Sequence, residues 1–232
     1  MDARSAQNCI VNYLKELFGK DNVYNEWKAK TGAKDWLKFD HNIYAPRPDI
    51  AVGPLNIEEG RNIQNIESVF TQHQQFFKKL KNYKDNINYC TNSNPRCLIA
   101  IEIENSNKGK HMLGNIINAS ILGKIGIIVT LKKDFYEDAK RICKYLEGAF
   151  KVEKSEHDPS NVIVIEYEDL KKILSAICSS EHNRHTGATN NLIGAVFGGV
   201  SYSAISKTYQ RMLERLQTDR ELRKKKSRHT GL

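Results

Sequence analysis

The chain is poor in cysteine, in acidic residues and in long apolar runs, and each shortage excludes a class of protein. Its five cysteines, Cys9, Cys90, Cys97, Cys143 and Cys178, are scattered and show no C-x-x-C spacing. An odd, dispersed set argues against a disulfide framework and against a zinc site. No apolar run approaches the roughly 20 residues of a membrane span, and the first residues, MDARSAQNC, lack the apolar segment of a signal peptide. The sequence therefore predicts a protein of the reducing cytoplasm with no membrane partner.

Acidic residues are outnumbered, with 27 Asp and Glu against 36 Lys and Arg and a net charge of +9. Residues 181–232 hold ten Lys and Arg against four Asp and Glu, which accounts for two thirds of the excess. A basic end of this kind suits a polyanion such as nucleic acid, or an anionic membrane surface. The alternative is a solvated tail that only keeps the protein soluble.

The rest of the composition is that of a globular domain, with 40% apolar and 27% charged residues among 232. A chain of this length buries enough surface to fold without disulfides. Apolar spacing and turn residues predict helices at 5–18, 67–82, 108–122, 134–146 and 168–178, and extended segments at 22–29, 36–52, 97–104, 124–130 and 161–167. From residue 97 onward strands and helices alternate, which indicates an α/β domain with parallel strand pairs. The two earlier extended segments are expected to join the same sheet.

A polar stretch at residues 179–190 predicts a linker between two parts of the chain. We expect residues 1–178 to form the α/β core, with a helical insertion at about 67–95. Residues 191–232 are expected to form a basic, helical C-terminal extension.

Two glutamates end the predicted strand CLIAIEIE, which spans residues 97–104. Residues two apart in a strand point to the same side, so Glu102 and Glu104 should share a face with Leu98 and Ala100. In open α/β sheets, ligands bind beyond the carboxyl ends of the strands, where these glutamates lie. Two half-buried carboxylates repel each other, and a divalent cation such as Mg²⁺ relieves that repulsion. The alternative is that both glutamates emerge into solvent and pair with nearby lysines.

A third carboxylate supports the metal interpretation. Asp49, in Pro48-Asp49-Ile50-Ala51-Val52, starts another predicted strand. One aspartate on a neighbouring strand and two glutamates at a strand end make a plausible cage for one or two metal ions.

These residues together resemble the PD-(D/E)xK nuclease superfamily. Pro48-Asp49 is followed, after a gap, by an apolar strand that ends in Glu102-Ile103-Glu104. The order of predicted elements from residue 5 to about residue 130 is similar to the α-β-β-β-α-β core of that family. The resemblance implies a restriction-endonuclease-like mixed sheet flanked by helices, and an enzyme that hydrolyses phosphodiester bonds of double-stranded DNA with Mg²⁺, or with Mn²⁺ in its place.

The resemblance also implies roles for single residues. Asp49, Glu102 and the backbone carbonyl of Ile103 would hold the metal ion, with Glu104 beside them. The family usually has lysine where this chain has Glu104, although some type II restriction endonucleases carry E-x-E. In that variant Glu104 acts as a general base or as a second metal ligand. The alternative is that Glu104 marks a decayed site.

Several other residues are candidates for the same site. Lys108 and Lys110, just past the strand, would supply the missing lysine or contact phosphate; otherwise they are ordinary surface lysines. His111 follows them and is a phosphate-facing or a structural residue. Glu26, in the segment 22–29, is a further candidate carboxylate, and otherwise a surface glutamate.

Contacts to DNA need cations and side chains that face the phosphates. Asn115 and Asn118 are helix-unfavourable amides, which either form hydrogen bonds in the core or line the DNA side. The residues expected to bind nucleic acid are Lys108, Lys110, His111, Arg223, Lys224, Lys225 and Lys226.

Three functions are compatible with this pattern. The first is a metal-dependent DNA endonuclease of the restriction type, which by analogy with that class would be a homodimer. The second is a repair or recombination nuclease that acts on DNA structure or ends. The third is a DNA-binding protein without catalysis, whose nuclease site has degenerated.

Overall fold

The computed structural model describes most of the first three quarters of the chain. The described residues are 1–28, 46–53, 55, 63–84, 87–88, 91–93, 95–106, 108–155 and 157–180, and of 63–67 only the backbone is described. The chain divides into two compact units, Met1–Cys178 and Ser179–Leu232, and the description below concerns the first of them. Much of the predicted segment 36–52, nearly all of the predicted linker and the whole C-terminal extension, with Arg223 to Lys226, lie outside the described residues.

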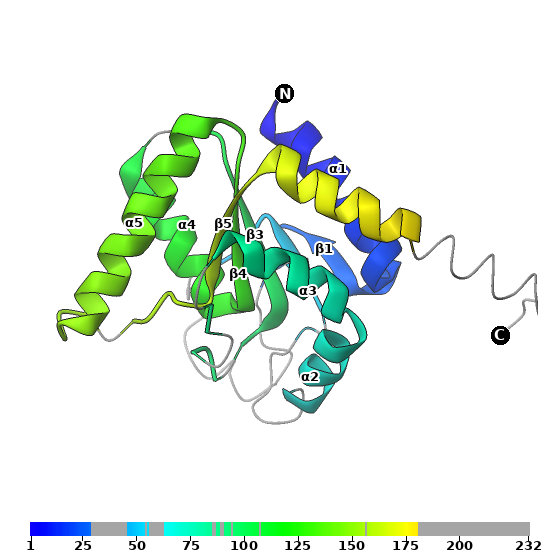
Figure 1. Ribbon diagram of the computed structural model, residues 1–232, viewed down its shortest axis with the longest axis horizontal. Helices are drawn as coiled ribbons and strands as arrows, with labels where there is room; N and C mark the ends of the chain where they lie inside the picture. The colour runs from blue at the N-terminus through cyan, green and yellow to red at the C-terminus, as the bar shows by residue number, and fades with distance from the viewer. Residues whose placement is uncertain are drawn as a thin grey trace, which may run out of the picture. The chain divides into compact units, whose positions relative to one another are not determined.

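Five strands form one mixed sheet with the order β1-β2-β3-β4-β5 (Figure 1). β1, β2 and β3 are antiparallel neighbours, whereas β3, β4 and β5 are parallel. The alternation from residue 97 onward and the placement of the two earlier segments on the same sheet are therefore confirmed. The strands are β1 (Val23–Asn25), β2 (Ile50–Val52), β3 (Cys97–Glu104), β4 (Gly123–Thr130) and β5 (Val162–Glu166).

Helices connect and cover these strands. The first helix begins two residues earlier than predicted, because Asp2 caps it by accepting a hydrogen bond from the backbone amide of Ser5. The helices are α1 (Ala3–Phe18), α2 (Ile63–Gln72), α3 (Gln74–Leu80), α4 (Gly109–Leu122) and α5 (Lys133–Lys151). Residues 167–180 are also helical, and short 3₁₀ turns occur at Lys20–Asn22 (η1) and Lys81–Tyr83 (η3). None of these described helices is both long and apolar enough to span a bilayer.

The prediction of one helix over residues 67–82 is wrong. The structure has α2 and α3, with His73 between them in a non-helical conformation (φ −106°, ψ 30°). The ring of His73 lies against Phe18 of α1, with 4.3 Å between ring centroids. The predicted helix is therefore interrupted at His73, where the chain packs against α1, and the apolar spacing alone did not reveal this interruption.

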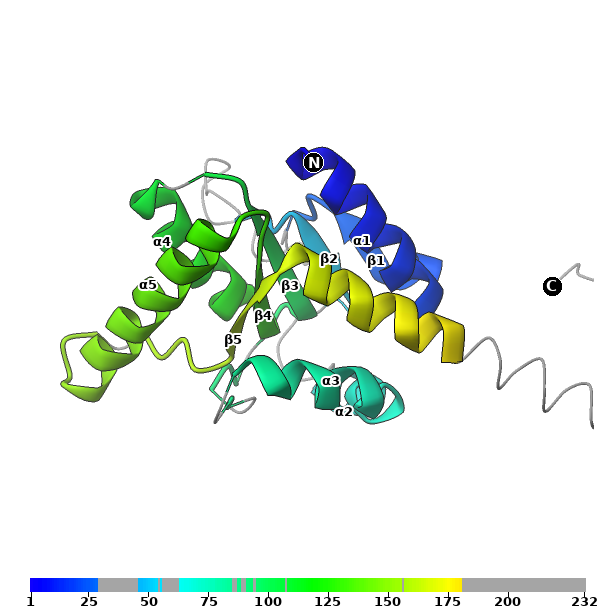
Figure 2. The same cartoon turned by 45° about the horizontal axis from the view of Figure 1, so that its top comes forward.

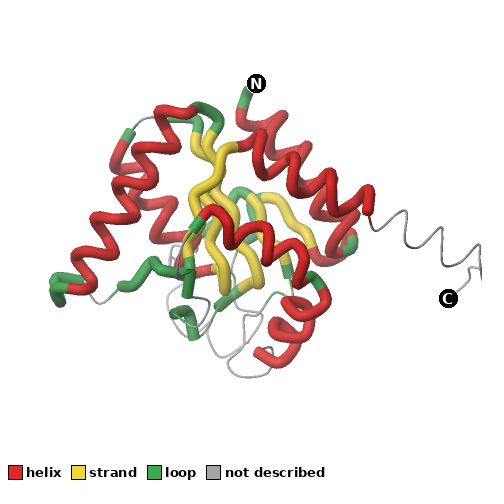
Figure 3. The backbone as a smooth tube through the Cα atoms, in the orientation of Figure 1, coloured by secondary structure: helices red, strands yellow, loops and turns green. Residues whose placement is uncertain are grey.

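The sheet is covered by helices on both faces (Figures 2 and 3). On one face α1, α3 and residues 167–180 pack against side chains such as Ile99, Ile101 and Ile127. On the other face α4 and α5 pack against Ala51, Ala100 and Ile128. This three-layer α/β/α arrangement explains why all eight residues of β3 are buried.

The side chains of β3 alternate between these two cores, with one exception. Ile99, Ile101 and Ile103 belong to the core under α1, and Ala100 belongs to the core under α4. At the start of the strand the expected faces are exchanged, since Leu98 joins the first core and Cys97 the second. The alternation over the rest of the strand directs the two glutamates to the α4 side.

Candidate functional site

Asp49, the residue immediately before β2, lies beside Glu102 of β3. β2 and β3 pair with Ile50 opposite Ile101, so the same antiparallel register places Asp49 opposite Glu102. The carboxylate Oδ2 of Asp49 accepts a hydrogen bond from the backbone amide of Ile103, with 2.7 Å between the two atoms. The structure therefore brings together the aspartate and the glutamate strand that the sequence separates by some fifty residues.

Both glutamates of β3 are buried, so the alternative in which they emerge into solvent is wrong. Glu102 is 4% exposed and Glu104 is 2% exposed. The two side chains share the α4 side of the sheet, and none of the described lysines forms an ion pair with either of them. Burying carboxylates without a countercharge costs free energy. Buried carboxylates of this kind are therefore unusual outside functional sites.

The ionisation of these groups reflects that cost. Burial raises the pKa of Glu102 to about 9, and the charges of Asp49 and Glu104 act in the same direction. Burial also raises the pKa of Asp49, as does the charge of Glu26, whereas the hydrogen bond from Ile103 lowers it. The pKa of Glu104 is raised by burial and by Asp49. The three carboxylates thus share one electrostatic environment.

Two amides of α4 reach this cluster from above the sheet. The Nδ2 atom of Asn115 donates a hydrogen bond to Oε1 of Glu104 at 2.6 Å. A hydrogen bond from the side chain of Asn118 lowers the pKa of Glu102. Positions three apart in a helix lie on the same face, which lets both amides contact the strand. Both amides therefore form hydrogen bonds with the carboxylates of β3, and a role for them on the DNA side stays a prediction.

Two buried polar atoms in this region have no hydrogen-bond partner among the described residues. They are Oε1 of Glu102 and Oγ1 of Thr130. Thr130 is the last residue of β4 and lies opposite Glu104 in the parallel register of β3 and β4. Buried polar atoms are almost always hydrogen-bonded in proteins, so two exceptions at adjacent strand ends indicate a place for a polar ligand, a water or an ion.

Thr130 and Gln7 are contacts of this region that the sequence did not indicate. One feature of the sequence could have identified Thr130. It ends the strand KIGIIVT, and the carboxyl ends of parallel strands meet at one edge of the sheet. Gln7 of α1 donates a hydrogen bond from Nε2 to the backbone carbonyl of Asp49 at 2.7 Å. Nothing in the sequence pairs Gln7 with Asp49, since their contact depends on how α1 packs.

The remaining candidates lie around the cluster rather than in it. Lys108 is the N-cap residue of α4, and both Lys108 and Lys110 are exposed. His111, in the first turn of α4, lies near enough to lower the pKa of Glu104. Glu26 has a left-handed backbone (φ 44°) and its carboxylate lies 3.9 Å from Arg47, with both side chains at least half exposed. The backbone amide of Glu26 donates a hydrogen bond to the carbonyl of Asp49 at 2.9 Å, whereas its carboxylate acts on the cluster through its charge on Asp49.

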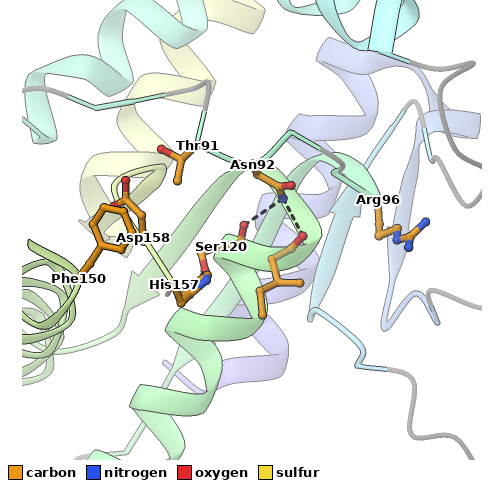
Figure 4. Close-up of a pocket in the computed structure, with 8 residues that line it drawn as sticks. Thr91, Asn92, Arg96, Ser120, Phe150, His157 and Asp158 are labelled. Carbon is orange, nitrogen blue, oxygen red and sulfur yellow. Dashed lines mark hydrogen bonds between the residues drawn. The ribbon is translucent and has the colours of Figure 1, made fainter. Parts of the chain in front are cut away.

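A cavity of about 560 Å³ lies away from these carboxylates, where α4 ends and β4 begins (Figure 4). Its polar side chains are engaged in holding the chain. Nδ2 of Asn92 donates to the carbonyls of Ser120, Ile121 and Gly123, and Oγ of Ser120 contacts both Nε2 of His157 and the carbonyl of Ile117. We therefore assign it a structural role at the end of α4. It is lined by Thr91, Asn92, Arg96, Ser120, Ile121, Phe150, His157 and Asp158.

No family model, no curated protein and no solved structure matches this chain. The assignment of the carboxylate cluster therefore rests on its own geometry. Within the described part of the chain, no three His, Cys, Asp or Glu side chains are arranged to hold a metal ion by themselves. A cation at this cluster would need a smaller set of carboxylates, completed by backbone oxygen and water, which is the usual environment of Mg²⁺.

Proposed function

We propose that the protein is a metal-dependent deoxyribonuclease of the PD-(D/E)xK type, with a restriction-endonuclease-like core. The observation that carries the proposal is the convergence of the buried Glu102 and Glu104 with the half-buried Asp49 at the paired strands β2 and β3. Buried carboxylates that raise one another's pKa favour a cation between them. The mixed sheet, with α1 before it and α4 after the Glu102 strand, has the element order expected of that core.

The donor set fits Mg²⁺ or Mn²⁺, because every candidate ligand is an oxygen atom. Asp49, Glu102 and the carbonyl of Ile103 would hold the ion. Oε1 of Glu102, which lacks a hydrogen-bond partner among the described residues, is the atom best placed to accept it. A bound divalent ion would polarise a phosphoryl oxygen and lower the pKa of a water molecule.

Glu104 would receive the proton of the attacking water. Its pKa is raised, so it holds a proton more readily than a free glutamate; Asn115 donates to Oε1, and Oε2 would accept the proton. A role as a second metal ligand would use the same free oxygen. Burial, together with the hydrogen bond from Asn115, argues against Glu104 being an unconstrained relic.

Double-stranded DNA would approach from the N-terminus of α4. Lys108, Lys110 and His111 lie there, and the first two are exposed and form no ion pair with any described residue. Arg223, Lys224, Lys225 and Lys226 would add phosphate contacts. A homodimer would place two such sites on opposite strands, by analogy with restriction enzymes.

The proposal is tested by incubating plasmid DNA with Mg²⁺ or Mn²⁺ and comparing Asp49→Asn and Glu102→Gln with the unmodified protein. Each substitution should reduce cleavage by about a thousandfold, a typical cost of removing a group that stabilises charge in the transition state. Glu16→Gln, the same chemical change at an exposed position of α1, is the control and should cleave normally. Undiminished cleavage by either site variant would refute the assignment.

Mg²⁺ titration followed by calorimetry gives a readout that needs no cleavage. Binding that Glu102→Gln abolishes supports the metal site. No binding in the unmodified protein would favour the third function, DNA binding without catalysis. If cleavage occurs, discrete fragments from a panel of plasmids indicate sequence specificity, whereas their absence favours a repair or recombination nuclease.

A further inference from the structure

A second cluster of charged residues lies on α5, away from the carboxylates of β3. Lys140, Lys144 and Glu147 are spaced four and three apart, so they form a stripe on one face of this helix. Lys84, just after η3, faces the stripe from across a cavity of about 300 Å³. The cavity is lined by Tyr83, Lys84, Lys140, Cys143, Lys144, Glu147, Val162 and Val164.

Contacts hold two of the three lysines that line this cavity, whereas Lys144 is exposed. Nζ of Lys84 lies 2.7 Å from Oε1 of Glu147 and 3.3 Å from the carbonyl of Pro159. The Lys84 side chain is only 15% exposed. Lys140 is held over the ring of Tyr136, with 5.0 Å from Nζ to the ring centroid. Two of the three ammonium groups therefore have defined positions.

The charges of this cavity do not balance. Three lysines face one glutamate, and that glutamate is already paired with Lys84. Among the described residues the floor offers no further anion, since it consists of the buried thiol of Cys143 and the β5 side chains of Val162 and Val164. Like charges gathered around an apolar floor repel one another unless an anion lies between them.

We propose that this cavity binds a phosphate group, through Lys140 and Lys144 on α5 and Lys84 on the facing wall. Lysine ammonium groups bind phosphate as compact point charges, and an excess of two positive charges matches the charge of a phosphate dianion. The phosphate belongs either to a nucleic-acid backbone or to a small phosphorylated molecule. The inference does not depend on the nuclease proposal, because no residue of the carboxylate cluster takes part.

The experiment uses the isotope-labelled full-length protein and two double variants of equal charge change. Inorganic phosphate is titrated into each protein at constant ionic strength, and amide shifts are followed by NMR. Lys140→Gln/Lys144→Gln removes the proposed ligands. Lys171→Gln/Lys172→Gln is the matched control, because Lys171 likewise lies over an aromatic ring, that of Tyr167, and faces no part of the cavity.

We expect shifts centred on residues 83–84 and 140–147, and an affinity for phosphate that falls about tenfold or more in the cavity variant but not in the control. Glu147→Gln should change the affinity in the opposite direction, because it removes the one anion among the described residues that line the cavity. Equal weakening in both double variants, shifts spread over all exposed lysines, or unchanged affinity in Glu147→Gln would overturn the proposal.

A short DNA duplex, titrated in the presence of EDTA, distinguishes the two sources of phosphate. If the cavity variant also binds the duplex more weakly than the control does, the site takes a backbone phosphate. If only the binding of inorganic phosphate disappears, the site takes a small phosphorylated molecule. Absence of phosphate binding by the unmodified protein refutes both.

Discussion

In the proposed nuclease, Glu104 occupies the position at which that family usually has lysine, and this changes what the end of β3 requires from its surroundings. A lysine would bring its own positive charge to the strand end. Glu104 instead adds a third negative charge, and the described neighbours that bond the two glutamates are neutral donors: Asn115, Asn118 and the backbone of Asp49. Neutral amides orient a carboxylate without cancelling its charge, which leaves the negative potential available to a cation. The E-x-E sequence and the two amides are therefore consistent with each other.

Asn115→Ala tests whether that orientation matters. Removing the donor frees Oε1 of Glu104, and loss of a group that orients a ligand typically costs about 10- to 100-fold in metal affinity or activity. We expect Mg²⁺ affinity by calorimetry and the cleavage rate to fall within this range, with partial recovery in Asn115→Gln. Ile121→Ala, at an exposed position of the same helix, should leave both unchanged. Normal Mg²⁺ affinity in Asn115→Ala would contradict the role.

The raised pKa of Glu102 also allows a prediction of how the stability of the protein depends on pH in the absence of metal. Its pKa is raised from 4.5 to about 9 in the folded state. Between these values the folded chain keeps a proton that the unfolded chain has lost, so the free energy of unfolding falls as pH rises. Asp49 and Glu104 act in the same direction, because their pKa values are also raised.

Glu102→Gln removes the largest of these contributions. The free energy of unfolding is measured by urea unfolding with EDTA at about pH 5.5 and about pH 8. Its decrease between these two pH values should be smaller in the variant than in the unmodified protein. The two decreases should differ by at least about 1.4 kcal/mol, the equivalent of one pKa unit. Glu16→Gln should keep the original slope. Parallel pH profiles for all three proteins would show that Glu102 is not held in its neutral form.

At the scale of elements, the sequence was most informative where apolar runs are long. The predicted strand 97–104 and the neighbouring strand 124–130 agree with β3 and β4 to within a residue. In the described parts of the two earlier segments, β1 covers Val23–Asn25 of 22–29 and β2 covers Ile50–Val52 of 36–52, whereas residues 29–45 lie outside the described residues. Short strands are specified by their partners more than by their own residues, and the contacts of Gln7 and Thr130 depend on that pairing. Sequence could therefore propose the carboxylates and the amides of the following helix, but not the contacts of Gln7 and Thr130.

The close approach of α4 to the sheet depends on a glycine of β4. A Cβ atom at Gly126 would lie 2.9 Å from the carbonyl carbon of Ala119, 3.0 Å from its oxygen and 3.0 Å from Cγ2 of Val162. Two of these atoms are backbone and cannot move without shifting α4. Because α4 carries Asn115 and Asn118, the same glycine helps to set the distance between the amides and the carboxylates.

Gly126→Ala should therefore destabilise the protein by about 1–3 kcal/mol, the usual cost of overpacking. Gly114→Ala, in the middle of α4, is an informative control because a Cβ there meets nothing within 4 Å. It should stabilise the protein by roughly 0.5–1 kcal/mol, since alanine favours a helix over glycine. Urea unfolding measures both. Equal effects of the two substitutions would contradict the close contact between α4 and β4.

At the scale of the whole molecule, the three carboxylates of the cluster are opposite in sign to the net charge of the chain. Glu102 and Glu104 are buried at the end of β3 and Asp49 lies half-buried beside them, whereas the chain as a whole carries +9. An acidic site that must meet a polyanion needs cations elsewhere to offset the repulsion. The exposed Lys108 and Lys110, the stripe on α5 and the basic residues beyond 180 are candidates for that task, and they are separable by mutation.

The basic residues beyond 180 allow a quantitative prediction. Replacing Arg223, Lys224, Lys225 and Lys226 by Gln should weaken binding of a DNA duplex and flatten its dependence on salt, by about 0.9 in the slope of log K against log salt for each phosphate that the chain no longer neutralises. Fluorescence anisotropy over a salt series measures both quantities. Mg²⁺ affinity should stay unchanged, because the four residues take no part in the carboxylate cluster. If the slope is unaffected, residues 223–226 form a solvated tail, and the cations that neutralise phosphates must lie elsewhere in the chain.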